Sequence, residues 1–167
     1  QAMEELRLSL CDSVSPLRLR EENHWDLDLD ELRSLLRPNT RLLAVNFPNN
    51  PTGKVLAGSR WQELLELVRE RQIWLFSDEV YRGLERDPAQ TLEQAADAYD
   101  RALSLNVMSK AYGLRGVRIG WIACQNREIL AKMLQIKHYL SICNSAPAEL
   151  IATRALQRAP EILARNR

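Results

Sequence analysis

Cysteine and histidine are scarce in this sequence. Its 167 residues contain three cysteines, Cys11, Cys124 and Cys143, which lie far apart without CxxC spacing, and two isolated histidines, His24 and His138. A disulfide framework needs paired cysteines and a zinc site needs a close cluster of cysteine or histidine, so the spacing argues against both. We interpret the three cysteines as reduced core residues of a cytoplasmic protein and the histidines as structural residues.

Long apolar runs and an excess of one charge are also absent. No apolar run approaches about 20 residues, the length that spans a membrane. The sequence also does not begin with the charged segment and apolar segment of a signal peptide. The 23 basic and 22 acidic residues are interspersed and give a formal net charge of +1. We therefore predict a cytoplasmic protein with neither a membrane partner nor a nucleic-acid partner.

Apolar residues are plentiful and alternate between two spacings. They make up 46% of the chain against 27% charged residues, which is typical of one globular domain or part of one. Helical spacing occurs in residues 28–36, 59–68, 126–139 and 147–167, the last with a break at Pro160; strand-like runs occur in residues 14–19, 41–47, 73–76, 103–107 and 117–123. Strands that alternate with helices predict βαβ units and a mostly parallel sheet, the α/β class.

Local signals define three of the helices more closely. Asp28 with Glu31, and Ser59 with Gln62, have the spacing of N-terminal capping boxes. In the helix over residues 126–139, four apolar side chains share one face and are expected to point inward. They are Ile129, Leu130, Met133 and Ile136.

Polar residues collect directly after three of the strand-like runs. These segments are Asn46 to Gly53, Ser77 to Tyr81 and Ser109 to Gly116. Because ligands of open α/β sheets bind beyond the carboxyl ends of the strands, we predict a ligand site there. Lys110 is one of only four lysines and comes directly after such a run. An amine held in a partly desolvated pocket at this place can attack a carbonyl and form a Schiff base.

Each of these features has a structural alternative when it is considered alone. Residues 50–53 can be a simple turn, Asp78 a helix cap, Tyr81 a half-buried aromatic, Lys110 a surface lysine and Arg118 a solvated strand residue. Two phosphate-binding motifs are excluded, because the Gly-Lys pair at 53–54 lacks the rest of a P-loop and the later glycines lack GxGxxG spacing.

The order of the segments favours a functional interpretation. They are Asn50-Pro51-Thr52-Gly53, Ser77-Asp78-Glu79-Val80-Tyr81, Ser109-Lys110-Ala111-Tyr112-Gly113 and Val117-Arg118-Ile119-Gly120-Trp121. This series resembles the fold type I pyridoxal-phosphate-dependent enzymes, specifically the class I/II aminotransferase family, over essentially the whole chain. The resemblance implies a three-layer α/β/α fold whose mostly parallel sheet has one antiparallel strand. It also implies the cofactor pyridoxal 5′-phosphate, an amino acid and a 2-oxo acid as substrates, and a homodimer.

The resemblance assigns four residues to the cofactor ring. Lys110 matches the Schiff-base lysine, which also moves the proton of the substrate. Asp78 matches the carboxylate that faces the pyridine nitrogen and keeps it protonated. Asn50 and Tyr81 match the two residues that form hydrogen bonds with the phenolic oxygen of the ring.

Two further residues are assigned to the cofactor phosphate. Arg118, eight residues after Lys110, matches the phosphate-binding arginine, whose planar fork suits two phosphate oxygens. Ser109 is expected to add a hydroxyl to the same phosphate. Many relatives carry a phosphate-contacting serine three residues before the lysine, and this chain has Val107 there.

The extent of the resemblance brings further expectations. Residues 1–167 correspond to the central portion of the large, cofactor-binding domain, with its N-terminal part and the small domain missing, so we expect no turnover from the chain alone. A C–S lyase or synthase of the same fold remains an alternative, because substrate orientation sets the reaction type. Another alternative is an aminotransferase-like effector domain of a transcription regulator.

Overall fold

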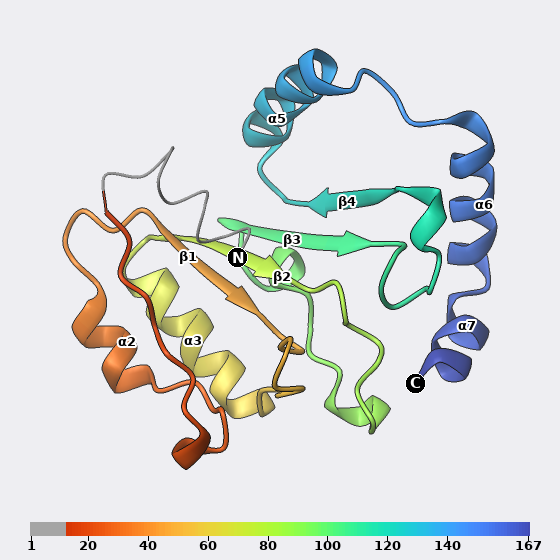
Figure 1. The fold of residues 1–167 in the computed structure, drawn as a ribbon. Coiled ribbons are helices and arrows are strands. Elements are labelled where there is room, and N and C mark those ends of the chain that lie inside the picture. The colour runs from red at the N-terminus through yellow and green to blue at the C-terminus, as the bar shows by residue number, and fades with distance from the viewer. Residues whose placement is uncertain (1–12) are drawn as a thin grey trace. The chain divides into compact units, whose positions relative to one another are not determined.

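A computed structural model of the chain describes residues 13–167 (Figure 1). The chain divides into two compact units, one ending at Asn39 and one covering Thr40–Arg167. Cys11 lies outside the described residues, and Cys124 is half-buried. Cys143 is exposed because it lies in the connection between two helices, so its interpretation as a core residue is wrong. No helix within residues 13–167 combines the length and the apolar character needed to cross a membrane.

The unit before Thr40 contains the 3-10 helix η1, Glu21–Asn23, and the helix α2, Leu29–Leu35. Asp28 caps α2, since its Oδ1 accepts hydrogen bonds from the backbone N–H groups of Asp30 at 3.0 Å and Glu31 at 2.9 Å. These bonds satisfy N–H groups that have no partner inside the helix. The cap predicted from the sequence at Asp28 is confirmed.

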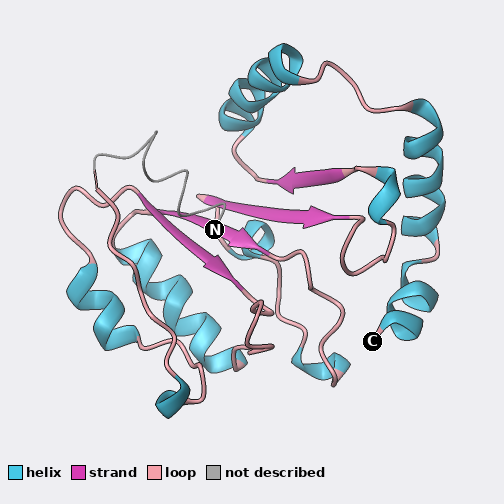
Figure 2. Ribbon diagram, in the orientation of Figure 1, coloured by secondary structure: helices cyan, strands magenta, loops and turns pink. Residues whose placement is uncertain are grey.

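The second unit is built on a four-stranded sheet in the order β1-β2-β3-β4. The strands are β1, Leu42–Asn46; β2, Trp74–Asp78; β3, Ala102–Val107; and β4, Gly120–Ala123. The first three run parallel and β4 pairs antiparallel with β3, as the arrows in Figure 2 show. The prediction of an α/β fold with a mostly parallel sheet and one antiparallel strand is confirmed.

Two predicted strands differ from the structure. Residues 14–19 form no strand, and Pro16 among them has no N–H to donate to a neighbouring strand. The strand predicted over residues 117–123 begins only at Gly120, because η3, Arg115–Val117, precedes it and Arg118 has a left-handed φ of 55°. A residue in that conformation cannot continue an extended strand.

Helices connect the parallel strands and form the core with them. The helix α3, Gly58–Glu70, connects β1 to β2, while η2, Pro88–Gln90, and α4, Ala95–Ala98, lie between β2 and β3. One face of α3 is buried, as its apolar spacing predicted for Trp61, Leu64, Leu65 and Val68. Leu67 is buried as well. The capping box predicted at Ser59 is wrong, since the helix already begins at Gly58 and Ala57 is its N-cap.

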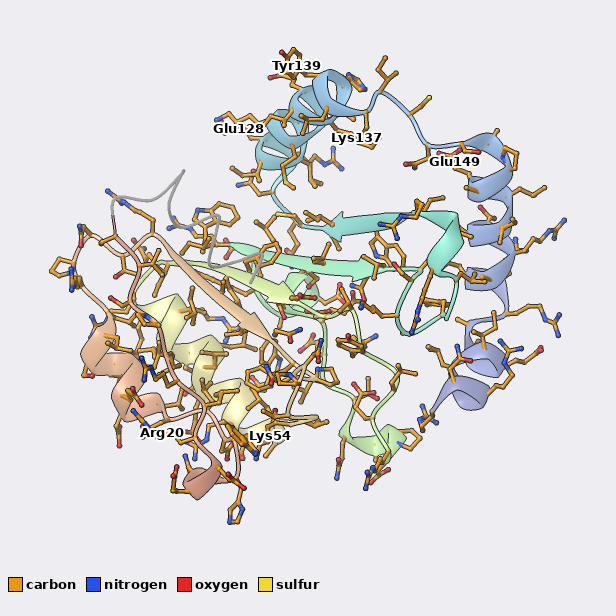
Figure 3. The ribbon with its side chains drawn as sticks, in the orientation of Figure 1. Arg20, Lys54, Glu128, Lys137, Tyr139 and Glu149 are labelled. Atoms are coloured by element: carbon orange, nitrogen blue, oxygen red, sulfur yellow. The ribbon has the colours of Figure 1, made fainter. Side chains whose placement is uncertain are left out.

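Three helices follow β4, and the first of them has little cover. They are α5, Arg127–Leu140; α6, Ala146–Gln157; and α7, Ala159–Asn166, with the predicted break between α6 and α7 present. No residue of α5 is buried. Of the predicted inward face, Ile129, Leu130 and Met133 are half-buried, whereas Ile136 is 60% exposed, so the prediction is wrong for Ile136. Figure 3 shows Tyr139 projecting from α5 on the side away from β4, and it is 91% exposed.

Candidate functional site

The carboxyl ends of the three parallel strands lie at one edge of the sheet. The strand register pairs Asn46 with Asp78, and Asp78 with Leu105. The Nδ2 of Asn46 donates a hydrogen bond of 3.0 Å to the backbone oxygen of Asp78, which ties the ends of β1 and β2 together. The turns that follow these strands carry the residues predicted from the sequence.

The turn after β1 is held by its own side chains. The Oδ1 of Asn49 accepts a hydrogen bond of 2.8 Å from the hydroxyl of Thr52, and the Oδ1 of Asn46 accepts one of 3.1 Å from the backbone N–H of Asn50. The turn closes at Gly53, whose φ of 73° lies in the region that glycine adopts without strain. These contacts fix the backbone at Asn50, whose own side chain is exposed.

Asn50 and Tyr81 meet although 31 residues separate them. The Nδ2 of Asn50 donates a hydrogen bond of 3.2 Å to the hydroxyl oxygen of Tyr81. Tyr81 is half-buried in the turn after β2. The pair therefore presents an amide and a phenol at one place above the carboxyl edge.

Lys110 approaches the same place from the turn after β3. Its Nζ lies 5.6 Å from the centroid of the Tyr81 ring, within the range of a cation–π contact. The Lys110 side chain is exposed, so the expected desolvated pocket is not present in the described chain. The physical reason is that nothing in residues 13–167 covers the amine, although the nearby residues Met108 and Ala111 are buried.

Asp78 completes this cluster from the end of β2. Partial burial raises the pKa of its carboxyl, while a hydrogen bond from the backbone N–H of Val80 and the attraction of Lys110 act in the opposite direction, and burial has the larger effect. The carboxylate therefore interacts electrostatically with the amine. Asn50, Asp78, Tyr81 and Lys110, predicted separately from three segments, are brought together by the fold.

Arg118 and Ser109 have surroundings different from those of these four residues. Arg118 is exposed, and its Nη1 donates a hydrogen bond of 3.2 Å to the backbone oxygen of Arg115. Ser109 is half-buried beside Lys110. Within the described residues, no hydrogen bond or ion pair joins either of them to Asp78, Tyr81 or Lys110.

Glu79 is a buried ionisable residue beside the site, and no role was assigned to it from the sequence. Its Oε1 accepts hydrogen bonds from the hydroxyl of Ser104 at 2.8 Å and from the backbone N–H of Ala95 at 2.9 Å. Burial raises the pKa of its carboxyl despite these bonds. Side chains alternate along a strand, so placing the Asp78 side chain at the site predicts that Glu79 points to the opposite face. That alternation was the available signal.

A small cavity lies under the turns on the Glu79 side. Its volume is about 20 Å³, counted as the space open to the centre of a water molecule. The residues that line it include Phe47, Trp61, Glu79 and Arg82. The Oε2 of Glu79 and the Nε1 of Trp61 are buried without a hydrogen-bond partner in the described part of the chain. Two of the residues that line this cavity, Trp61 and Glu79, therefore each have a buried polar atom without a hydrogen-bond partner in the described residues.

Known proteins resemble this chain in sequence. A model of the family "Aminotransferase class I and II" matches residues 4–166. The chain is 37% identical over 151 residues to capreomycidine synthase of Streptomyces vinaceus, covering 90% of this chain and 38% of that protein. It is 35% identical over 124 residues to arginine–pyruvate transaminase of Pseudomonas aeruginosa, covering 71% of this chain and 32% of that protein.

A solved structure shows the same likeness in three dimensions. A PLP-dependent aminotransferase from Streptococcus suis superposes with a TM-score of 0.87 at 36% identity, covering 96% of this chain and 42% of that one. The chain thus spans about a third to two fifths of the length of these relatives, and it matches them over most of its own length. It belongs to the class I and II aminotransferase family, which has fold type I and pyridoxal 5′-phosphate as its cofactor.

Proposed function

We propose that this chain carries the cofactor site of an aminotransferase that moves an amino group between an amino acid and a 2-oxo acid. The observation that carries the proposal is the convergence of Asn50, Asp78, Tyr81 and Lys110 at the carboxyl edge of the sheet. Neither a turn, a cap nor a surface lysine needs these four groups to meet. A binding site for one polar ring does.

The chemistry of these side chains fits pyridoxal 5′-phosphate. Lys110 offers an amine for the aldehyde, Asp78 a carboxylate for the ring nitrogen, and the hydrogen-bonded pair Asn50 and Tyr81 an amide and a phenol for the ring hydroxyl. When bound, the cofactor supplies an electron sink for the charge left by a departing proton. The exposed guanidinium of Arg118 donates one hydrogen bond to the backbone oxygen of Arg115. Its other N–H groups can donate to a phosphate.

Each residue then has a defined task in the proposed reaction. Lys110 would hold the cofactor through a Schiff base and, once released, move a proton as base and acid. Asp78 would stay ionised opposite a protonated ring nitrogen, since a neighbouring positive charge lowers the pKa of a carboxyl. Asn50 and Tyr81 would hold the ring hydroxyl as an anion, and Arg118 with Ser109 would hold the phosphate.

We also propose a cytoplasmic homodimer as the active form. The support is the family membership and the absence of paired cysteines from the sequence. In this form the exposed amine of Lys110 would be covered by protein outside the described chain. Desolvation of an amine favours its neutral, nucleophilic form.

A second candidate, a synthase of the same fold, has one specific observation in its favour. Capreomycidine synthase is 37% identical to this chain over 151 residues. Transamination and a synthase reaction can share the cofactor site, because the reaction type depends on how the substrate is oriented. Product analysis distinguishes them: a transaminase converts a 2-oxo acid into an amino acid with exchange of the amino group, and a synthase consumes no 2-oxo acid.

The test of the cofactor site is covalent labelling of the full-length protein. After incubation with pyridoxal 5′-phosphate and reduction with borohydride, we expect the label on the peptide that contains Lys110. Lys110→Ala should abolish the label and the amino-group transfer, whereas Lys132→Ala on exposed α5 should leave both unchanged. A label spread evenly over the lysines, or persisting in Lys110→Ala, would refute the proposed site.

A further inference from the structure

The end of α7 contacts the turns that carry Lys110 and Tyr81. The Nδ2 of Asn166 donates a hydrogen bond of 3.0 Å to the backbone oxygen of Ala111, the residue after Lys110. One helical turn earlier, Leu163 packs against Gly83 so closely that a methyl group on Gly83 would lie 2.9 Å from its Cδ1. Gly83 follows Tyr81 in the turn after β2. The C-terminal end of α7 therefore contacts both the turn after β2 and the turn after β3.

The peptide groups of Ala111 are held from two sides. Its N–H donates a hydrogen bond of 3.3 Å to the backbone oxygen of Val80, in the turn that carries Tyr81. Its oxygen accepts the bond from Asn166, and its side chain is buried. The Lys110 oxygen also accepts a bond of 2.9 Å from the N–H of Gly113. Asn166 is the only side chain in this set of bonds, since the other partners are backbone atoms.

We propose that Asn166 is a positioning residue for Lys110. By holding the Ala111 oxygen, its amide fixes the backbone next to Lys110 and keeps the Lys110 turn against the Tyr81 turn. The effect of this contact on catalysis rests on the function proposed above for Lys110. Misplacement of a reacting group by about 1 Å can reduce a rate by about 10²-fold, so a single anchor at this place affects the chemistry.

The test compares Asn166→Asp with Asn144→Asp in the full-length protein. The substitution at Asn166 keeps the size of the side chain but replaces the N–H donor by an oxygen, which repels the Ala111 oxygen. Asn144 is a matched control, because its Nδ2 also donates one hydrogen bond, of 3.2 Å to Glu149, at an exposed place before α6. Exchange protection of the β2 amides establishes that each variant is folded.

The first measurement is hydrogen exchange at the Ala111 and Gly113 amides without cofactor. We expect Asn166→Asp to exchange faster by roughly fivefold, the factor that corresponds to one lost hydrogen bond, and Asn144→Asp to match the unaltered protein. Unchanged exchange in Asn166→Asp overturns the inference. This measurement does not depend on the proposed function.

The second measurement is the rate at which pyridoxal 5′-phosphate forms a reducible adduct at Lys110. We expect Asn166→Asp to slow it by about fivefold or more, with labelling at exposed Lys132 unaffected. Faster exchange with an unchanged adduct rate overturns the positioning of Lys110. If the unaltered protein forms no adduct at Lys110, the proposed function fails, and hydrogen exchange alone decides whether Asn166 orders the turn.

Discussion

At the scale of single residues, neighbours from distant segments decide the chemistry of the site. Asp78 and Glu79 are adjacent in the sequence but face opposite sides of the sheet edge. Asp78 is half-buried and interacts with the amine of Lys110, whereas Glu79 is buried against Ser104 and the backbone of Ala95. The first carboxylate is available to a ligand, and the second is part of the packing.

Glu79 is expected to make stability depend on pH. Burial raises its pKa in the folded protein above the ordinary value of 4.5, so the unfolded chain loses this proton first as pH rises. The free energy of unfolding should therefore fall with rising pH from about pH 4.5 until the folded carboxyl has also ionised. Glu79→Gln removes this dependence, because its amide oxygen can accept the same bonds without a charge.

Urea denaturation of Glu79→Gln at pH 4 to 8 measures this difference. The stability of the variant relative to the unaltered protein should rise with pH across that range. Glu128→Gln serves as a control of opposite sign, because Lys132 lowers the pKa of the exposed Glu128 carboxyl. Parallel pH profiles for Glu79→Gln and the unaltered protein would contradict the assignment of Glu79 as a buried carboxyl.

Gly83 offers a residue-scale test of the packing under α7. Its φ of 90° and the 2.9 Å approach of Leu163 both oppose a side chain, so Gly83→Ala should lower the free energy of unfolding by about 1–3 kcal/mol. Gly58→Ala is the matched control, since its added methyl meets nothing within 4 Å and it lies in the first turn of α3. Thermal unfolding should show this control unchanged or stabilised by about 0.4–1 kcal/mol.

At the scale of elements, local sequence predicts where helices lie more reliably than what caps or covers them. The helices α2, α3, α5 and the pair α6 and α7 all occur where apolar spacing predicted them. Of two capping boxes with the same spacing, Asp28 caps its helix and Ser59 does not, because α3 begins one residue before Ser59. The apolar stripe of α3 is buried, whereas that of α5 has no buried residue. Helical spacing is local, but burial needs a partner surface.

The two capping boxes give an element-scale prediction. Asp28→Ala removes the acceptor of two backbone N–H groups and should cost about 1 kcal/mol in the stability of the unit that contains α2. Ser59→Ala should change the free energy of unfolding by less than about 0.5 kcal/mol, as at an ordinary surface position. Hydrogen exchange at the amides of α2 and α3 measures each local effect. Equal losses would mean that Ser59 caps α3 in solution.

At the scale of the whole molecule, the fold brings the candidate site residues together but leaves two of them exposed within the described chain. The turns after β1, β2 and β3 bring Asn50, Tyr81 and Lys110 together, yet the side chains of Asn50 and Lys110 are exposed. The chain spans 38% of the length of one relative and 42% of a solved neighbour. Enzymes obtain much of their rate from positioning and from the exclusion of water.

The 167-residue chain by itself is therefore expected to show negligible aminotransfer. Within the described residues the amine of Lys110 is exposed to water rather than held in an enclosed site. A coupled assay of the purified chain and of the full-length protein, each with pyridoxal 5′-phosphate, amino acid and 2-oxo acid, makes the comparison. Comparable turnover by both proteins would show that residues 1–167 suffice.

The sequence by itself determined the family, the cofactor, the places of the longer helices and the class of the sheet. These depend on residue types and on spacing along the chain, such as the segment around Lys110 and the cap at Asp28. Only the tertiary structure decided that Asn50 reaches Tyr81, that Glu79 is buried, that Lys110 and α5 are exposed, and that Asn166 holds the turn beside Lys110. Contacts across 31 or 55 residues depend on how the sheet register and helix packing close in space, which no local pattern records.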